Sequence, residues 1–285
     1  SRLSENSMGY ASVMVYVDDF DAANARIELA CDVADLFQAG LIGISGSVPA
    51  SPMIDPYTGA ATPAQALTDE HDAAAEQVKR AEARFRRVAG ARRSLVSWRG
   101  AVHHPAELVA REARAVDLII VGRASEHGRQ SNALDPGDVL MAAGRPVLVA
   151  PPELPQGNML ARVIVAWRDS RESRRAVADT LPVLRKAEQV TVVGISEYLE
   201  EEEATKLSVN DVASFIRLHG VAATPLALSQ THETSAKRLI DYARDNNVGL
   251  IVLGGYGHAR VREWAFGGVT RSLLKTSPVC CLFSH

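Results

Sequence analysis

The chain has 285 residues, of which 47% are hydrophobic and 23% charged, so it is an ordinary globular protein, long enough for two domains, and neither fibrous nor disordered. A formal net charge of -3 at pH 7 gives no excess of basic surface, which argues against nucleic acid as a partner. No apolar run approaches the roughly 20 residues that cross a bilayer, and residues 1–6 lack the apolar core of a signal peptide, so we expect a cytoplasmic protein with no membrane partner.

Short apolar, β-branched runs alternate with stretches of helical periodicity in the first half of the chain. The last predicted helix has a strong start, because Asp135, Pro136 and Asp138 are residue types preferred at the N-cap, at the first helical position and in the first turn. The alternation predicts strands at residues 12–17, 41–45, 94–98, 117–122 and 146–150, and helices at residues 20–39, 67–90, 105–115 and 136–143.

The second half follows the same alternation after a linker rich in proline and glycine at residues 151–157. The sequence itself repeats as well, since residues 11–19 are echoed by residues 161–169, and residues 117–122 by residues 249–254. We therefore expect two copies of one domain, at residues 1–150 and 151–285. In the second copy, strands are predicted at residues 162–167, 190–196, 221–228, 249–254 and 278–283, and helices at residues 170–187, 200–219, 233–246 and 268–276.

Strands that read as continuous Val, Ile and Leu are buried on both faces, as parallel strands between two helix layers are. Each half is therefore predicted to be a doubly wound, Rossmann-like α/β domain with a five-stranded parallel sheet. In such sheets ligands bind beyond the carboxyl ends of the strands, where the strand order reverses. We also expect residues 147–149 to pair with residues 279–281, because pairing the two last strands would cover edges that invite aggregation and make the repeats an intramolecular pseudo-dimer.

The strongest functional motif follows the fourth strand of the second copy. Gly254 and Gly257 are followed by nine residues and then by Gly267 and Gly268, directly before a predicted helix. Glycine lets the backbone come close to a ligand, and the free N–H groups of a helix start present partial positive charge to an anion, so the pattern indicates a phosphate-binding loop. The loop is neither a Walker A motif nor a G-x-G-x-x-G turn. A purely structural turn is the alternative.

This glycine pattern, together with the opening of the second copy from Val165 to Ser170, resembles the universal stress protein family, and the resemblance spans essentially the whole chain as a tandem pair. It implies an adenine nucleotide alpha hydrolase-like fold with strand order 3-2-1-4-5, expression linked to stress and dimerisation through the last strand. One branch of the family binds ATP. In that branch an aspartate after the first strand recognises the adenosine, and the loop glycines with a following Ser or Thr hold the phosphates.

Carried over residue by residue, the implied adenosine aspartate is present in one copy and displaced in the other. Asp18 occupies that position in the first copy, whereas the second copy has Arg168 there and Asp169 one residue later. Both aspartates have an alternative interpretation as caps of the helices that follow them, and Ser170 is an equally good cap for the second.

The residues that the resemblance implies for phosphate binding are better preserved in the second copy than in the first. Gly254, Gly257 and Gly267 are all present in the second copy, where Gly268 stands at the family's hydroxyl position and Thr270 supplies a hydroxyl two residues later. In the first copy the loop after its fourth strand is shorter and differently spaced. Asp138 puts negative charge near the phosphate position there, so phosphate binding in the first copy is disfavoured.

The sequence provides no nucleophile elbow, no paired carboxylates and no metal motif, so a binding protein is favoured over an enzyme and no metal site is expected. The favoured interpretation is a non-catalytic stress-response module that binds ATP, with magnesium, or another adenine nucleotide through the loop of the C-terminal domain. One alternative is a nucleotide-free scaffold or regulatory interaction protein. The protein partner is unknown, and further association of two chains as a homodimer is left open. The other alternative is slow ATP hydrolysis or phosphotransfer.

Overall fold

The computed structural model describes residues 9–49, 64–90, 92, 95–123, 133–196, 198–229, 233–255 and 268–285. The chain forms two compact units, an N-terminal unit that spans Ala11–Ala143 and a C-terminal unit that spans Gly144–His285 and includes Tyr10. The boundary precedes residues 147–150, so the fifth strand of the first repeat belongs to the C-terminal unit.

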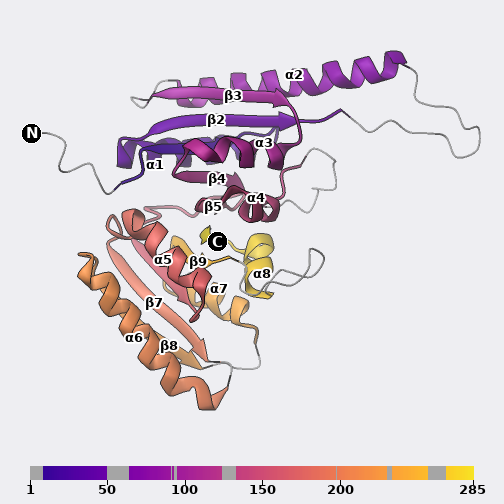
Figure 1. The fold of residues 1–285 in the computed structure, drawn as a ribbon. Coiled ribbons are helices and arrows are strands. Elements are labelled where there is room, and N and C mark those ends of the chain that lie inside the picture. The colour runs from indigo at the N-terminus through magenta and orange to yellow at the C-terminus, as the bar shows by residue number, and fades with distance from the viewer. Residues whose placement is uncertain are drawn as a thin grey trace, which may run out of the picture. The chain divides into compact units, whose positions relative to one another are not determined.

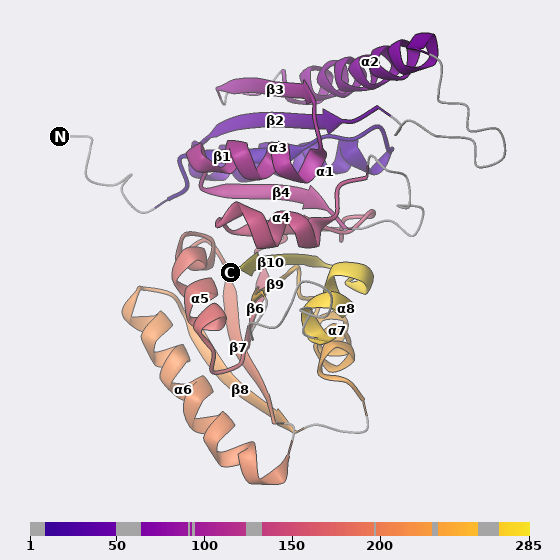
Figure 2. The same cartoon turned by 45° about the vertical axis from the view of Figure 1, so that its right-hand side comes forward.

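The N-terminal unit is a doubly wound α/β fold (Figures 1 and 2). Its four strands are parallel and lie in the order β3-β2-β1-β4. Helix α1 packs against α2, and α3 packs against α4, so that helices cover both faces of the sheet. In chain order the elements are β1 (Ser12–Tyr16), α1 (Ala22–Phe37), β2 (Gly40–Ser47), α2 (Ala64–Ala89), β3 (Val96–Val102), α3 (Pro105–Glu112), a 3-10 turn (Ala113–Ala115), β4 (Leu118–Gly122) and α4 (Pro136–Ala143).

The C-terminal unit repeats this fold and adds β5. Strands β8, β7, β6, β9 and β10 are parallel and adjacent in that order, which is the 3-2-1-4-5 order expected from the sequence. The elements are β5 (Val147–Ala150), β6 (Arg162–Trp167), α5 (Arg171–Leu184), β7 (Gln189–Ser196), a 3-10 turn (Leu199–Glu201), α6 (Glu202–Leu218), β8 (Ala223–Ser229), α7 (Ser235–Asp245), β9 (Leu250–Gly254), α8 (Gly268–Thr276) and β10 (Cys280–Ser284). Every strand and helix predicted from the sequence is confirmed, with bounds within a few residues.

Burial explains why the central strands read as continuous apolar runs. In β1, neighbouring residues Val13, Met14 and Val15 point to opposite faces, and all three are fully buried. The terminal strands β3 and β8 are only partly buried. Pro225 lies inside β8, which fits a strand at the edge of a sheet because proline has no N–H for a second neighbour.

The expected pairing of the two last strands is confirmed. Strand β5 runs antiparallel to β10, with Leu148 opposite Leu282, and each of these leucines is only 1% exposed. The partner residues in β10 are 281–283 rather than the predicted 279–281. Val279 lies in a turn, in which its N–H donates to the hydroxyl of Ser277 (3.3 Å), and the strand begins after it at Cys280.

The N-terminal unit contains a buried carboxylate whose pKa makes the stability of the unit depend on pH. Glu112, at the end of α3, is 8% exposed and pairs with Arg99, Arg111 and Arg114. Burial alone would raise the pKa of Glu112, but the hydrogen bonds and charges of these arginines outweigh it and hold the pKa below the ordinary value. A lowered folded pKa stabilises the unit above the unfolded pKa, and this contribution is lost as the pH falls through the folded pKa.

We therefore expect Glu112→Gln to lower the melting temperature at pH 7 and to flatten its decline in acid. The measurement is thermal melting followed by circular dichroism between about pH 7 and pH 3, the range over which a glutamate titrates. If the melting temperatures of the variant and the wild type fell by the same amount between these pH values, Glu112 would not be the source of the pH dependence.

Candidate functional site

A cleft of about 800 Å³ opens at the carboxyl ends of β6, β7 and β9 in the C-terminal unit. This is the edge at which doubly wound sheets bind ligands. The first turns of α5 and α8 contribute to its wall, so two helix starts border the same space. Of the residues singled out from the sequence, those that line this cleft are Arg168, Asp169, Ser170, Gly254, Gly268 and Thr270.

The loop from β6 to α5 forms one side of the cleft. Ser170 is the N-cap of α5, because its hydroxyl accepts a hydrogen bond from the N–H of Ser173 (3.2 Å). The interpretation of Ser170 as the cap is thereby confirmed. The side chain of Asp169 is 64% exposed and forms an ion pair with Arg174. Its carboxylate therefore lies in a solvated part of the cleft wall and is already paired with a cation.

Gly254 ends β9 where that strand packs against the start of α5. A Cβ atom at Gly254 would lie 2.5 Å from the backbone nitrogen of Ser173 and 2.6 Å from the carbonyl carbon of Glu172. Both distances are well below van der Waals contact, so a glycine is needed here for the close approach of strand and helix. Packing thus explains Gly254, and its N–H and carbonyl remain part of the cleft wall.

Gly268, the first residue of α8, differs from Gly254 in the space around it. A Cβ atom there would meet none of the described residues within 4 Å, and Gly268 has no positive φ, so neither the packing of the described residues nor the backbone conformation requires a glycine. Gly268 lines the cleft and places no side chain between the cleft and the first turn of α8. Thr270, also in that turn, is 6% exposed and lines the cleft. Gly257 and Gly267 lie outside the described residues.

Several cleft residues were not predicted from the sequence. Trp167 ends β6 and lines the cleft, and its indole nitrogen is buried without an acceptor among the described residues. The starts of α6 and α7 contribute the hydroxyls of Thr205, Ser208 and Thr234, and Thr234 also caps α7 by accepting from the N–H of Lys237 (3.3 Å). Trp167 and Thr234 could have been found from their positions at or shortly after the ends of predicted strands, whereas Thr205 and Ser208 lie inside α6 and have no such signal.

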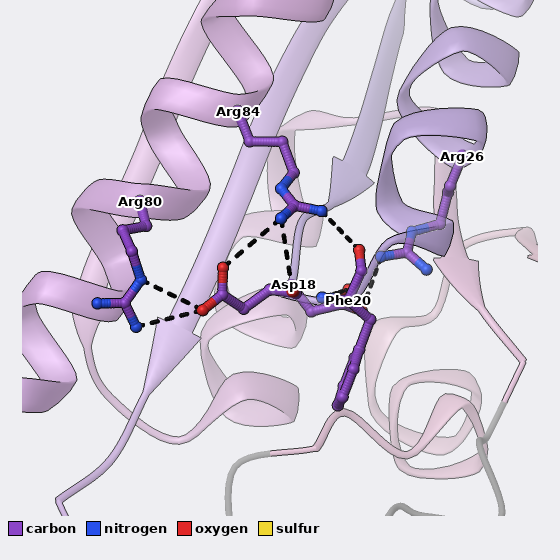
Figure 3. Close-up of polar contacts among 6 residues, drawn as sticks. Asp18, Phe20, Arg26, Arg80 and Arg84 are labelled. Atoms are coloured by element: carbon purple, nitrogen blue, oxygen red, sulfur yellow. Dashed lines mark hydrogen bonds and ion pairs between the residues drawn. The ribbon is translucent and has the colours of Figure 1, made fainter.

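Asp18 lies in the N-terminal unit and is not among the residues that line the cleft. Figure 3 shows its contacts. Its carboxylate accepts hydrogen bonds from Nη2 of Arg26 (2.7 Å) and from the N–H of Phe20 (3.2 Å). The interpretation of Asp18 as the cap of the next helix is wrong. Helix α1 begins at Ala22, and the residue at its N-cap is Asp21, whose side chain makes no capping bond.

The start of α4 in the N-terminal unit has the capping chemistry expected from the sequence. The N–H of Gly137 donates to Asp135 (2.7 Å), with Pro136 as the first helical residue. Desolvation raises the pKa of Asp138, and the neighbouring charge of Asp135 raises it further. The negative charge of these two carboxylates opposes the binding of an anion at this helix start.

Among the described residues, no group of three or more His, Cys, Asp or Glu side chains is arranged to hold a metal ion. No helix in the described part of the chain is long and apolar enough to span a membrane.

Fold and cleft together define the class of protein: two tandem doubly wound α/β repeats, with a ligand-sized cleft at the carboxyl edge of the second. Among solved structures, a universal stress protein from Archaeoglobus fulgidus matches 96% of this chain over 97% of its own length, with a TM-score of 0.66 and 15% identity. A putative universal stress protein from Pseudomonas aeruginosa matches 97% of this chain over 94% of its own length, with a TM-score of 0.58 and 14% identity. The chain has the universal stress protein fold over nearly its whole length, as its motifs indicate.

A universal stress protein solved in complex with cAMP also matches, over 51% of this chain and 99% of its own length, with a TM-score of 0.33 and 19% identity. No protein family model and no curated protein matches the sequence.

Proposed function

We propose that this chain is a tandem universal stress protein whose C-terminal unit binds ATP, with magnesium, or another adenine nucleotide, without catalysing a reaction on it. The observation that carries the proposal is the cleft at the carboxyl ends of β6, β7 and β9, into which the start of α8 opens without a side chain at Gly268. An anion placed there meets backbone N–H groups and the positive end of the helix dipole.

The residues present fit a nucleotide in two parts. Gly268 and Thr270 would hold phosphate groups, because they combine helix N–H groups with a hydroxyl in one turn. The adenosine would lie along the ends of β6 and β7, where Trp167 and Ile195 supply apolar surface. Asp169 would face it only after exchanging its partner Arg174, so we expect the aspartate contact to be weak.

The accompanying features belong to the same proposal. The repeats would be residues 1–150 and 151–285, joined as an intramolecular pseudo-dimer in which β5 of the first repeat pairs with β10 of the second. A change of ligand in the cleft would alter the surface presented to a protein partner, in the cytoplasm. Gly257 and Gly267 would complete the phosphate loop, as the sequence pattern implies.

Thermal melting with and without Mg-ATP tests the proposal. Binding to the folded state at a ligand concentration of about 100 times Kd adds roughly 2.7 kcal/mol to the free energy of unfolding. Because Trp167 lines the cleft, intrinsic fluorescence should change with the same concentration dependence. Magnesium alone and Mg-GTP are the controls for metal and base. An unchanged melt and unchanged fluorescence in millimolar ATP would refute ATP binding.

A nucleotide-free scaffold is the second candidate function, and one observation favours it. Leu207, Phe215 and Leu218 lie along the outer side of α6 and are 60%, 45% and 86% exposed. Apolar side chains gathered on an exposed helix are typical of a surface that binds another protein. For a scaffold of this kind, substitution of these residues should abolish binding of the protein partner, and the wild type should bind no ATP, which separates the two candidate functions.

A further inference from the structure

The ligand edge of the N-terminal unit is occupied by one of the chain's own side chains. Arg26 extends from α1 and is only 5% exposed. Its Nε donates to the carbonyl oxygen of Tyr16 at the end of β1 (2.9 Å), and its Nη2 donates to the carboxylate of Asp18 (2.7 Å), as Figure 3 shows for Asp18. The guanidinium is therefore held by two acceptors just beyond the end of β1.

Gly122 shows that the guanidinium also reaches β4. A Cβ atom at Gly122, the last residue of β4, would lie 2.1 Å from Nη1 of Arg26. Strand β1 has β2 on one side and β4 on the other, so the strand order reverses between β1 and β4. Ligands of doubly wound sheets bind at this reversal. Arg26 thus fills the place where the fold would otherwise take a ligand.

Helix α2 holds the same loop from the other side (Figure 3). Nη1 of Arg84 donates to the carbonyl oxygen of Phe20 (2.7 Å), and Nε and Nη2 of Arg80 both donate to Asp19 (3.2 Å each). Residues 18–20 are therefore fixed by three arginines from two helices. We call Arg26, Arg80 and Arg84 the arginine clamp.

The second repeat lacks this arrangement. Aligning residues 11–19 with residues 161–169 places Ala176 opposite Arg26, and Ala176 is a buried residue of α5 with no polar side chain. At the end of β9, Gly254 makes room for the backbone of α5 rather than for a guanidinium. The equivalent edge is the open cleft. The two repeats therefore use the same position of one fold in opposite ways.

We infer that the ligand crevice of the N-terminal repeat is a cation site that Arg26 occupies permanently, so that this repeat takes no nucleotide and the whole chain binds one ligand, in the C-terminal cleft. The chemistry at this position supports a planar cation rather than an anion, because the described groups that hold the guanidinium are a carbonyl oxygen and a carboxylate, which are both acceptors. The stoichiometry rests on the proposed function, whereas the cation site does not.

The test of the cation site is chemical rescue. Arg26→Ala removes the guanidinium and leaves the acceptors of Tyr16 and Asp18 without their donor, so the melting temperature of the N-terminal unit should fall by more than about 5 °C. Added methylguanidinium at millimolar concentration should restore part of this loss with a saturable dose dependence. Potassium chloride at the same ionic strength should not.

Arg80→Ala is the matched control, because it removes an arginine of the same clamp that is 53% exposed and leaves the crevice filled. It should melt close to the wild type and gain nothing from methylguanidinium. Equal responses of both variants and the wild type, or no loss in Arg26→Ala, would overturn the inference. Should Arg26→Ala fail to fold, Asp18→Asn must destabilise the chain more than Asp19→Asn does, since only Asp18 faces the buried guanidinium.

Isothermal titration of the wild type with Mg-ATP tests the stoichiometry. One bound nucleotide per chain is the expected result, and two would overturn the inference while leaving the proposed function intact. Failure to bind any nucleotide would refute the proposed function and the stoichiometry, and the cation site would then stand or fall by the rescue experiment alone.

Discussion

Replacing Gly254 by alanine should destabilise the C-terminal unit by about 3 kcal/mol, at the upper end of overpacking effects. The added methyl group would lie 2.5 Å from the nitrogen of Ser173 and 2.6 Å from the carbonyl carbon of Glu172, and both are backbone atoms of a capped helix that have no rotamer to change. Relief requires the end of β9 and the first turn of α5 to separate. Because both belong to the cleft wall, nucleotide affinity should fall together with stability.

Gly268→Ala provides the matched control, since the same methyl group there meets no atom within 4 Å in the part of the chain that the structure describes. Alanine is a better helix former than glycine, so the stability of this variant should be unchanged or higher by less than about 1 kcal/mol. Its methyl group borders the cleft, and we expect weaker ATP binding without a loss of stability. Chemical denaturation and calorimetric titration of both variants separate the two roles. Equal stability losses in the two variants would contradict the packing argument.

Leu148→Asp should have an effect of similar or larger size, about 4 kcal/mol, because it places a carboxylate without a partner inside the sheet. Leu148 lies opposite Leu282 in the antiparallel pair of β5 and β10, and both side chains are 1% exposed. The expected outcome is an earlier unfolding transition, with aggregation through the freed edge of β10. Thermal melting and size-exclusion chromatography measure the two effects.

Leu218→Asp is the control for that substitution, because Leu218 lies on α6 and is 86% exposed. A surface change of this kind should alter stability by no more than about 0.5 kcal/mol. If Leu148→Asp were as stable and as monodisperse as Leu218→Asp, the pairing of β5 with β10 would not be a stabilising contact.

The elements and the topology of this protein follow from local sequence patterns. Runs such as residues 250–253 are apolar on both faces, which is typical of a central strand between helix layers. Because the sequence repeats, each strand and helix is predicted separately in both copies. Helix starts are also local, as the caps at Asp135 and Ser170 show. The pairing of the last strands is predicted from a need to cover edges, but its register does not follow from periodicity, and residues 277–279 form a turn before the strand.

The roles of individual charged residues were harder to predict, because they depend on side chains that meet across elements. Asp18 has an interpretation as a helix cap since aspartate is a common capping residue, yet its partner is Arg26, which lies just over one turn into α1. Nothing in the spacing of the sequence indicates that a helical arginine reaches the ends of two strands. Gly254 was read as a ligand contact, whereas contact with α5 is a sufficient reason for it.

The position of β5 has a consequence for how the two halves of the chain stay together. The fifth strand of the first repeat pairs with β10 of the second through residues 147–149. The two repeats are therefore connected both by the linker at residues 151–157 and by this strand pairing. A single proteolytic nick in that stretch would leave two fragments that migrate as one species until a denaturant separates them. The covalent linker determines which two repeats associate, whereas the pairing of β5 with β10 holds them together.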